Sequence, residues 1–217
     1  MAAEGNSVAC ENAPLKIGVL ISGSGTNLQA LIDEIATGQA NAAIVKVISS
    51  RPGVQGIARA EAAGIPVVAF NRDVYADREQ ADERIVAEMR EAGAEYLFMA
   101  GYMRKVGTKV LDAFPDRVVN LHPALLPSFT GAHAIRDAFE SGVKVTGVTV
   151  HFANAEYDKG PIIAQEPVRI EEGDTLDSLE ARIHQTEHQL YPRVLRLIAD
   201  GRVSIDEQRH VRVSPEA

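Results

Sequence analysis

Short apolar segments alternate with amphipathic segments along most of the chain. The apolar segments carry few polar positions, which is typical of strands buried on both faces of a parallel sheet. The amphipathic segments repeat their apolar residues at helical spacing. The expected strands are residues 15–21, 43–49, 66–70, 96–100, 118–122, 144–152 and 161–168. The expected helices are residues 28–38, 56–63, 77–92, 108–114, 134–140 and 176–199.

The order of these elements predicts the fold class. Strands and helices alternate from Leu15 to about Glu140, which favours an α/β fold: a Rossmann-like, doubly wound, mostly parallel seven-stranded sheet with helices on both faces. No helix separates the last two strands, so we expect one antiparallel strand near the C-terminal end. We expect one domain at residues 15–203, a disordered N-terminal arm at 1–14 and a short C-terminal tail at 204–217.

Composition excludes several classes of protein. The formal net charge of −8 disfavours a nucleic acid or an anionic membrane as the main partner. The single cysteine, Cys10, excludes an internal disulfide and a zinc site built from several cysteines. No apolar run reaches about 18 residues, and residues 1–14 lack the basic and apolar regions of a secretory signal. We therefore expect a cytoplasmic protein.

The strongest chemical feature is the strand that contains Asn120 and His122. Residues two apart in a strand point to the same face, so these two side chains should lie side by side. Pro123 ends the strand just after them, at the carboxyl end where open α/β sheets build their active sites. An asparagine amide can stabilise an oxyanion, and a histidine can transfer protons near neutral pH. Taken singly, each residue is more often structural, but the two together, two apart and just before Pro123, favour chemistry.

A glycine-rich loop, residues 23–27, lies between the first strand and the first helix. Backbone N–H groups and Asn27 could hold a phosphate at this helix N-terminus. The loop does not match the dinucleotide fingerprint, because Leu28 stands at its third glycine position, and no Gly-Lys-Ser/Thr follows as in a P-loop. The alternative is a tight turn with a helix cap.

Three further features are weaker on their own. Asp158, in a loop between two strands, could fold back beside a histidine and orient it, or be solvated. His151, at the end of the preceding strand, is a weaker candidate for ligand contact. His184, Glu187 and His188 match the His-x-x-Glu-His pattern of one class of zinc peptidase. No accessory glutamate motif follows that pattern, so we expect no metal.

Six motifs occur in the order that is known from one enzyme family. They are Ile21-Ser-Gly-Ser-Gly-Thr-Asn-Leu-Gln-Ala30, Ala100-Gly-Tyr-Met-Arg104, Asn120-Leu-His-Pro-Ala-Leu-Leu-Pro127, Gly147-Val-Thr-Val-His151, Asp158-Lys-Gly-Pro161 and Glu187-His188. Over about residues 15–203 the sequence resembles the phosphoribosylglycinamide formyltransferase family, the folate-dependent enzymes of purine synthesis. The resemblance implies the formyltransferase fold and transfer of a formyl group from 10-formyltetrahydrofolate to the glycine amine of 5-phosphoribosylglycinamide.

The resemblance also implies a role for each matching position. Asn120, His122 and Asp158 would be catalytic. The residues that would bind the ribonucleotide are Gly25, Thr26, Asn27, Glu187 and, as a possible phosphate contact, His184. The residues that would bind the folate are Arg78, Met103, Arg104, Lys105, Val106 and Asn120. The enzyme would need no metal or nucleic acid, would not bind a membrane, and would be a monomer or homodimer.

Other functions remain open at this point. A formyltetrahydrofolate deformylase would carry an N-terminal regulatory domain, and a methionyl-tRNA formyltransferase would carry a basic C-terminal domain. We expect neither domain here. A non-catalytic phosphate-binding module would need the glycine loop but not the set of Asn120, His122 and Asp158.

Overall fold

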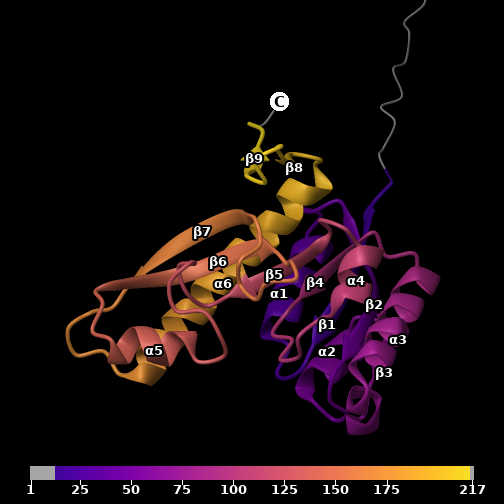
Figure 1. Ribbon diagram of the computed structural model, residues 1–217, viewed down its shortest axis with the longest axis horizontal. Coiled ribbons are helices and arrows are strands. Elements are labelled where there is room, and N and C mark those ends of the chain that lie inside the picture. The colour runs from indigo at the N-terminus through magenta and orange to yellow at the C-terminus, as the bar shows by residue number, and fades with distance from the viewer. Residues whose placement is uncertain (1–12, 216–217) are drawn as a thin grey trace, which may run out of the picture.

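In the computed structural model, which describes residues 13–215, seven strands form one sheet. The arm expected at residues 1–14 lies, but for its last two residues, outside the described residues. The strands are β1 (Leu15–Ile21), β2 (Ala42–Ser49), β3 (Val67–Ala69), β4 (Tyr96–Met99), β5 (Val118–His122), β6 (Val145–Phe152) and β7 (Ile162–Arg169). Their order in the sheet is β3-β2-β1-β4-β5-β6-β7 (Figure 1).

Strand directions confirm the fold predicted from the sequence. The first five strands are mutually parallel, and β6 is antiparallel to both β5 and β7. One antiparallel strand therefore lies next to β5. In the β5–β6 pairing, Asn120 stands opposite His151 and His122 stands opposite Thr149. This register brings His151 of β6 next to Asn120 and near His122 of β5.

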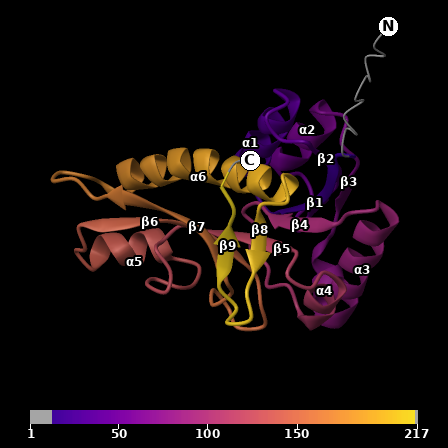
Figure 2. The same cartoon turned by 90° about the horizontal axis from the view of Figure 1, so that it is seen from above.

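Helices cover both faces of the sheet, as Figure 2 shows. They are α1 (Thr26–Ala36), α2 (Gln55–Ala62), α3 (Arg78–Glu91), α4 (Thr108–Ala113), α5 (Ala134–Glu140) and α6 (Leu176–Ala199), with a 3-10 turn η1 (Arg72–Ala76) before α3. Apolar side chains of α1 and α6 form one core with the sheet, and those of α3 and α4 form a second core on the opposite face. This two-sided burial explains why the strands are almost continuously apolar.

The long helix α6 is fixed to the centre of the sheet. It begins at a capping box formed by Thr175 and Ser178. Leu179, Ile183 and other apolar residues of one face are buried against the sheet. The buried Tyr191 hydroxyl donates to Val119 O at 3.1 Å, which joins α6 to β5. This attachment determines where the polar residues of α6 lie relative to Asn120 and His122.

The C-terminal segment is more ordered than the sequence indicates. We expected a tail from residue 204, but β8 (Val203–Ile205) and β9 (Val211–Val213) pair as an antiparallel hairpin. Arg209 in its turn donates to Asp116 at 2.7 Å. Strands of three residues carry too little periodicity to be recognised in a sequence. The hairpin lies beside the C-terminal end of α6 (Figure 1).

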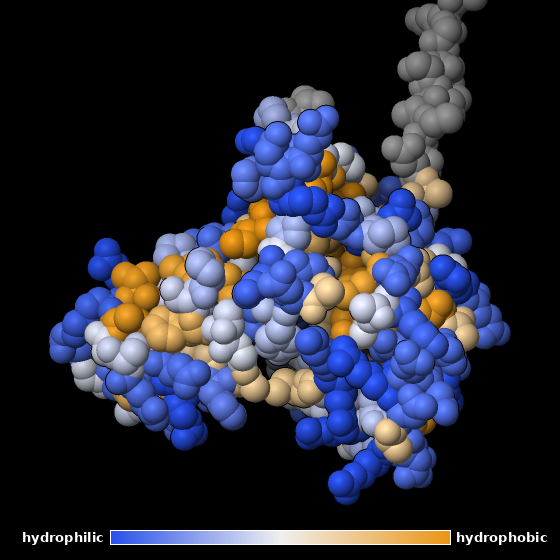
Figure 3. Space-filling model, viewed as in Figure 1, coloured by the Kyte–Doolittle hydropathy of each residue, from blue (hydrophilic) through white to orange (hydrophobic). Residues whose placement is uncertain are grey.

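The molecular surface is mixed in character. On the face seen in Figure 3, hydrophilic residues predominate and apolar residues reach the surface in scattered patches. Large apolar side chains that are exposed include Met103 and Tyr157. Among the described residues, no helix combines the length and the apolar composition that a membrane crossing needs.

Candidate active site

Loops that follow the carboxyl ends of β1, β4 and β5 converge on one cavity of about 420 Å³. The glycine loop, the segment after β4 and the end of β5 line it, and α6 closes one side. Its lining includes the candidate site residues Gly25, Thr26, Asn27, Met103, Asn120, His122, His184 and Glu187. The cavity thus lies at the edge of the sheet where the sequence placed it.

His122 is buried between two hydrogen-bond acceptors. Its Nε2 donates to the carbonyl oxygen of Phe129 at 2.8 Å, because a carbonyl can only accept. Its Nδ1 lies 3.6 Å from Asp158 Oδ2, an ion-pair distance. Only a ring protonated on both nitrogens presents an N–H to both partners. The surroundings of His122 therefore suit an imidazolium cation.

Asp158 reaches this position because its loop folds back against β6. Gly160 makes this possible, since a Cβ there would lie 1.6 Å from Phe152 O. Asp158 is itself buried, with a φ of 54°, and its Oδ2 accepts a hydrogen bond from Gly131 N at 2.9 Å. The aspartate is thus held beside the ring by the backbone. Of the two alternatives for Asp158, the structure shows the folded-back one.

Asn120 is oriented by His151, which is also buried. His151 Nδ1 donates to Phe152 O at 3.0 Å, so its Nε2 is free to accept from Asn120 Nδ2 at 3.1 Å. Burial lowers the pKa of His151, which keeps the ring neutral and preserves this arrangement. The second N–H of the Asn120 amide remains for a ligand. His151 therefore supports Asn120, a role that its position in the sequence does not indicate.

The glycine loop is tied to α6 through Glu187. Glu187 Oε2 accepts from Asn27 Nδ2 at 2.9 Å and lies 3.0 Å from His184 Nδ1. The hydrogen bond to Glu187 raises the pKa of His184, whose side chain is half exposed in the cavity. The Asn27 amide nitrogen is thus engaged by Glu187, so the loop offers an anion mainly its backbone N–H groups. A positive charge on His184 would lie on the same wall.

The segment after β4 lines a second, smaller hollow of about 30 Å³. Lys105 and Val106 border this hollow together with Asn120 and Asp158. Asn120 and Tyr157 line both hollows, so Asn120 stands where they meet. The smaller hollow therefore extends the larger cavity past the Asn120 amide.

Two of the predicted folate contacts lie outside these linings. Arg78 donates to Val106 O at 3.1 Å, and the Arg104 guanidinium lies 4.7 Å from the centre of the Tyr75 ring. Met103 is placed differently: its N–H donates to Ser22 Oγ at 2.8 Å while its side chain is exposed at the rim. Neither Arg78 nor Arg104 therefore lines either hollow.

The two histidines of α6 stack on each other, and His184 also bonds Glu187. The His184 and His188 rings stack with centroids 6.5 Å apart, and Glu187 is already bonded to both Asn27 and His184. Within residues 13–215, no group of three or more histidine, cysteine, aspartate or glutamate side chains is placed to hold a metal ion. The His-x-x-Glu-His pattern is thus explained as part of the wall beside the glycine loop.

Sequence reasoning missed several residues that shape the site. Phe129 O and Gly131 N hold His122 and Asp158 through backbone groups, which carry no side-chain signal. Ser22 accepts from Met103 N and also bonds Ser50 at 2.6 Å, which joins three strand ends. These contacts depend on strand order, and one sequence does not reveal strand order.

Comparison with known proteins gives a consistent result. The formyl transferase family matches residues 15–195. Phosphoribosylglycinamide formyltransferase of Bacillus subtilis is 39% identical over 181 residues, 83% of this chain and 93% of that protein. The trifunctional purine biosynthetic protein adenosine-3 of Gallus gallus is 41% identical over 89% of this chain. The chain spans about a fifth of that relative's length (19%).

A solved structure agrees with these matches. The crystal structure of glycinamide ribonucleotide transformylase 1 from Symbiobacterium toebii superimposes with a TM-score of 0.92 at 42% identity. The superposition covers 98% of this chain and all of that one (100%). The fold of nearly the whole chain is therefore shared with a protein of that description.

Proposed function

The chain belongs to the formyl transferase family, and we propose that it is a phosphoribosylglycinamide formyltransferase. It transfers the formyl group of 10-formyltetrahydrofolate to the glycine amine of 5-phosphoribosylglycinamide. The products are N-formylglycinamide ribonucleotide and tetrahydrofolate, and the reaction belongs to de novo purine (IMP) biosynthesis. The single observation that carries this proposal is the convergence of Asn120, His122 and Asp158 beside a loop suited to phosphate.

The two substrates bind on either side of Asn120. The ribonucleotide phosphate binds backbone N–H groups at Gly25, Thr26 and Asn27, and Glu187 contacts the ribose or amine side. The pterin of the folate binds against residues 103–106, where Met103 lines the larger cavity and Lys105 and Val106 border the smaller hollow. Arg78 and Arg104 lie outside that lining, where a folate reaching out of the hollow would contact them. This arrangement places the amine and the formyl carbon at Asn120.

The chemistry follows from ordinary acyl transfer. The amine nitrogen attacks the formyl carbon, and the carbonyl electrons move onto oxygen. The Asn120 amide and cationic His122 stabilise that oxyanion, and Asp158 stabilises the charge on His122. Collapse of the adduct breaks the bond between carbon and the folate nitrogen. The proton leaves the amine and reaches that nitrogen through His122 or an ordered water. No covalent enzyme intermediate is required.

The remaining features of the proposal come from the sequence. The formyl donor is a co-substrate, and the reaction uses neither metal nor nucleic acid. A net charge of −8 is consistent with small-molecule substrates held by local contacts. We infer a cytoplasmic enzyme that does not act on a membrane and works as a monomer or homodimer.

A two-substrate assay tests this function. Purified protein is mixed with 10-formyltetrahydrofolate and phosphoribosylglycinamide, and free tetrahydrofolate is measured. We expect tetrahydrofolate only when both substrates are present, at equal yield with the formylated ribonucleotide. Tetrahydrofolate released from the folate alone would indicate hydrolysis, and the proposal would be wrong.

His184 predicts a pH dependence of ribonucleotide binding. Its pKa lies above the usual 6.5 because Glu187 accepts from it; Glu180 adds to this shift, and burial of the ring opposes it. A cationic His184 attracts the phosphate, and this charge is lost as pH rises through the raised pKa. The KM of the ribonucleotide should therefore increase by about two- to fivefold above pH 6.5, a modest factor because the ring is half exposed.

The matched variant His184→Gln separates this effect from titration of the phosphate. At low pH the KM of this variant for the ribonucleotide should be higher than that of the wild type. Its change with pH should reflect only the ionisation of the phosphate, whose second pKa is about 6. The measurement is KM against pH for both proteins. Identical profiles would show that His184 does not contribute charge to the site.

A further inference from the structure

The glycine loop packs against α2 through a contact between two glycines. Gly25 has a φ of 72°, and a Cβ there would lie 2.6 Å from the Cα of Gly56. A Cβ on Gly56 would lie 2.7 Å from the Ile21 side chain and 3.0 Å from Gly23 O. Gly56 N donates to Gly23 O at 3.1 Å. The backbone of α2 therefore touches the backbone of the loop directly.

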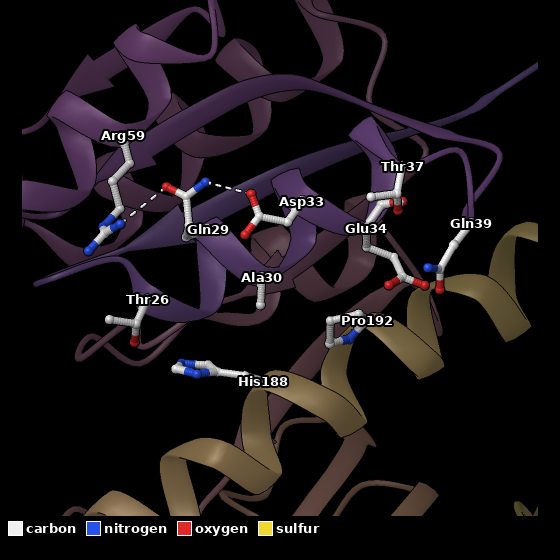
Figure 4. A pocket seen from close by; sticks show the side chains of 10 residues that line it. All are labelled: Thr26, Gln29, Ala30, Asp33, Glu34, Thr37, Gln39, Arg59, His188 and Pro192. Atoms are coloured by element: carbon white, nitrogen blue, oxygen red, sulfur yellow. Dashed lines mark hydrogen bonds between the residues drawn. The ribbon is translucent and has the colours of Figure 1, made fainter.

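One turn further along α2, Arg59 binds the same loop. Its Nε donates to Ser24 O at 2.9 Å, and its Nη1 donates to Gln29 Oε1 at 3.1 Å. Gln29 in turn donates to Asp33 at 2.8 Å (Figure 4). A single planar guanidinium thus joins the loop to the first turns of α1.

These contacts determine which way the loop N–H groups point. In a trans peptide the C=O and the following N–H point in opposite directions. The carbonyls of Gly23 and Ser24 both point at α2, so the N–H groups of Ser24 and Gly25 point away from it. Both residues line the active-site cavity. An anion in that cavity can meet N–H groups that are already oriented.

Arg59 itself is not in the active-site cavity. It lines an adjoining groove of about 440 Å³ between α1 and α6, which shares Thr26 with the cavity and has His188 on its opposite wall (Figure 4). Its influence on a ligand beside Gly25 would therefore pass through the loop rather than through contact.

We propose that Arg59 and Gly56 are positioning residues that hold the glycine loop ready for the substrate phosphate. The inference rests on the proposed function, because that function assigns the phosphate to this loop. Loss of Arg59 should weaken phosphate binding and leave formyl-donor binding and the chemical step unchanged. Loss of an arginine with a merely structural role would change phosphate binding, formyl-donor binding and the chemical step together, or would change none of them.

The test uses Arg59→Met, with Arg90→Met on the exposed face of α3 as the matched control. The KM values of both substrates and kcat are measured, together with ribose 5-phosphate binding by calorimetry. For Arg59→Met, we expect the KM of the ribonucleotide and the Kd of ribose 5-phosphate to rise about tenfold, the worth of one hydrogen bond to a charged group. For Arg90→Met, all values should match the wild type.

Arg59→Lys separates positioning from charge. An ammonium keeps the positive charge but cannot reproduce the planar fork to Ser24 O and Gln29. We expect it to bind ribose 5-phosphate almost as weakly as Arg59→Met does. Full recovery of affinity would mean that Arg59 acts by charge alone and would overturn the inference. Gly56→Ala, which forces the backbones of α2 and the glycine loop apart, should likewise raise the KM of the ribonucleotide and the Kd of ribose 5-phosphate.

The outcomes separate this inference from the function on which it rests. A wild-type protein that makes no formylated product would overturn the proposed function, whatever the variants do. An active wild type whose Arg59→Met variant binds ribose 5-phosphate equally well would overturn the inference alone. Equal melting temperatures of wild type and variant would confirm that the comparison is between folded proteins.

Discussion

Replacing His122 with alanine is expected to lower kcat by about 10²- to 10⁴-fold while the KM of each substrate changes little. The ring lies at the carboxyl end of β5 with acceptors at both nitrogens, so it can bring positive charge to the oxyanion. The charge on His122 stabilises the oxyanion of the transition state, which the bound substrates do not carry. Steady-state kinetics with each substrate varied in turn provides the measurement.

Two further variants sharpen this result. His122→Gln can still donate to Phe129 O but cannot become cationic, so its kcat should remain close to that of the alanine variant. His210→Ala, in the exposed turn of the C-terminal hairpin, is a matched histidine control and should behave as wild type. Loss of substrate binding in step with kcat would show that His122 has a structural role instead.

The substitution Asp158→Asn is expected to lower kcat by about 10²- to 10³-fold. Asparagine has nearly the same shape and can still accept from Gly131 N, so the loop should keep its place. What it loses is the negative charge 3.6 Å from His122 Nδ1, which stabilises the imidazolium. The variant therefore isolates charge from geometry, and kcat at saturating substrates is the quantity to compare.

Glu172→Gln supplies the control for the loss of one carboxylate. Glu172 is exposed and lines neither hollow, and its ion pair with Lys144 is of a kind that contributes little to stability. Its kcat should equal that of the wild type. If Asp158→Asn retained full activity, the carboxylate would have no part in catalysis, and the proposed division of roles around His122 would fail.

Much of the fold could be predicted because its strands are buried on both faces. Leu15–Ile21 and Val118–His122 have the bounds that their apolar runs indicate. The missing helix between β6 and β7 was enough to predict the antiparallel strand β6. The proximity of Asn120 and His122 followed from the period of two along a strand.

The rest of the site depends on contacts between distant segments. That His151 orients Asn120 follows from the register of β5 against β6, which one sequence does not specify. The partner of His122 is the backbone carbonyl of Phe129, and a carbonyl is available at every position. The close approach of Gly25 and Gly56 likewise becomes visible only in the folded chain.

The fate of an isotopically labelled formyl carbon tests the central claim most directly. The protein is given 10-[¹³C]formyltetrahydrofolate with phosphoribosylglycinamide, and the products are followed by NMR. We predict that the label passes completely to the glycine nitrogen of the ribonucleotide, and that His122→Ala slows this without changing the product. Label recovered as free formate, with the ribonucleotide unmodified, would contradict transfer between two bound substrates.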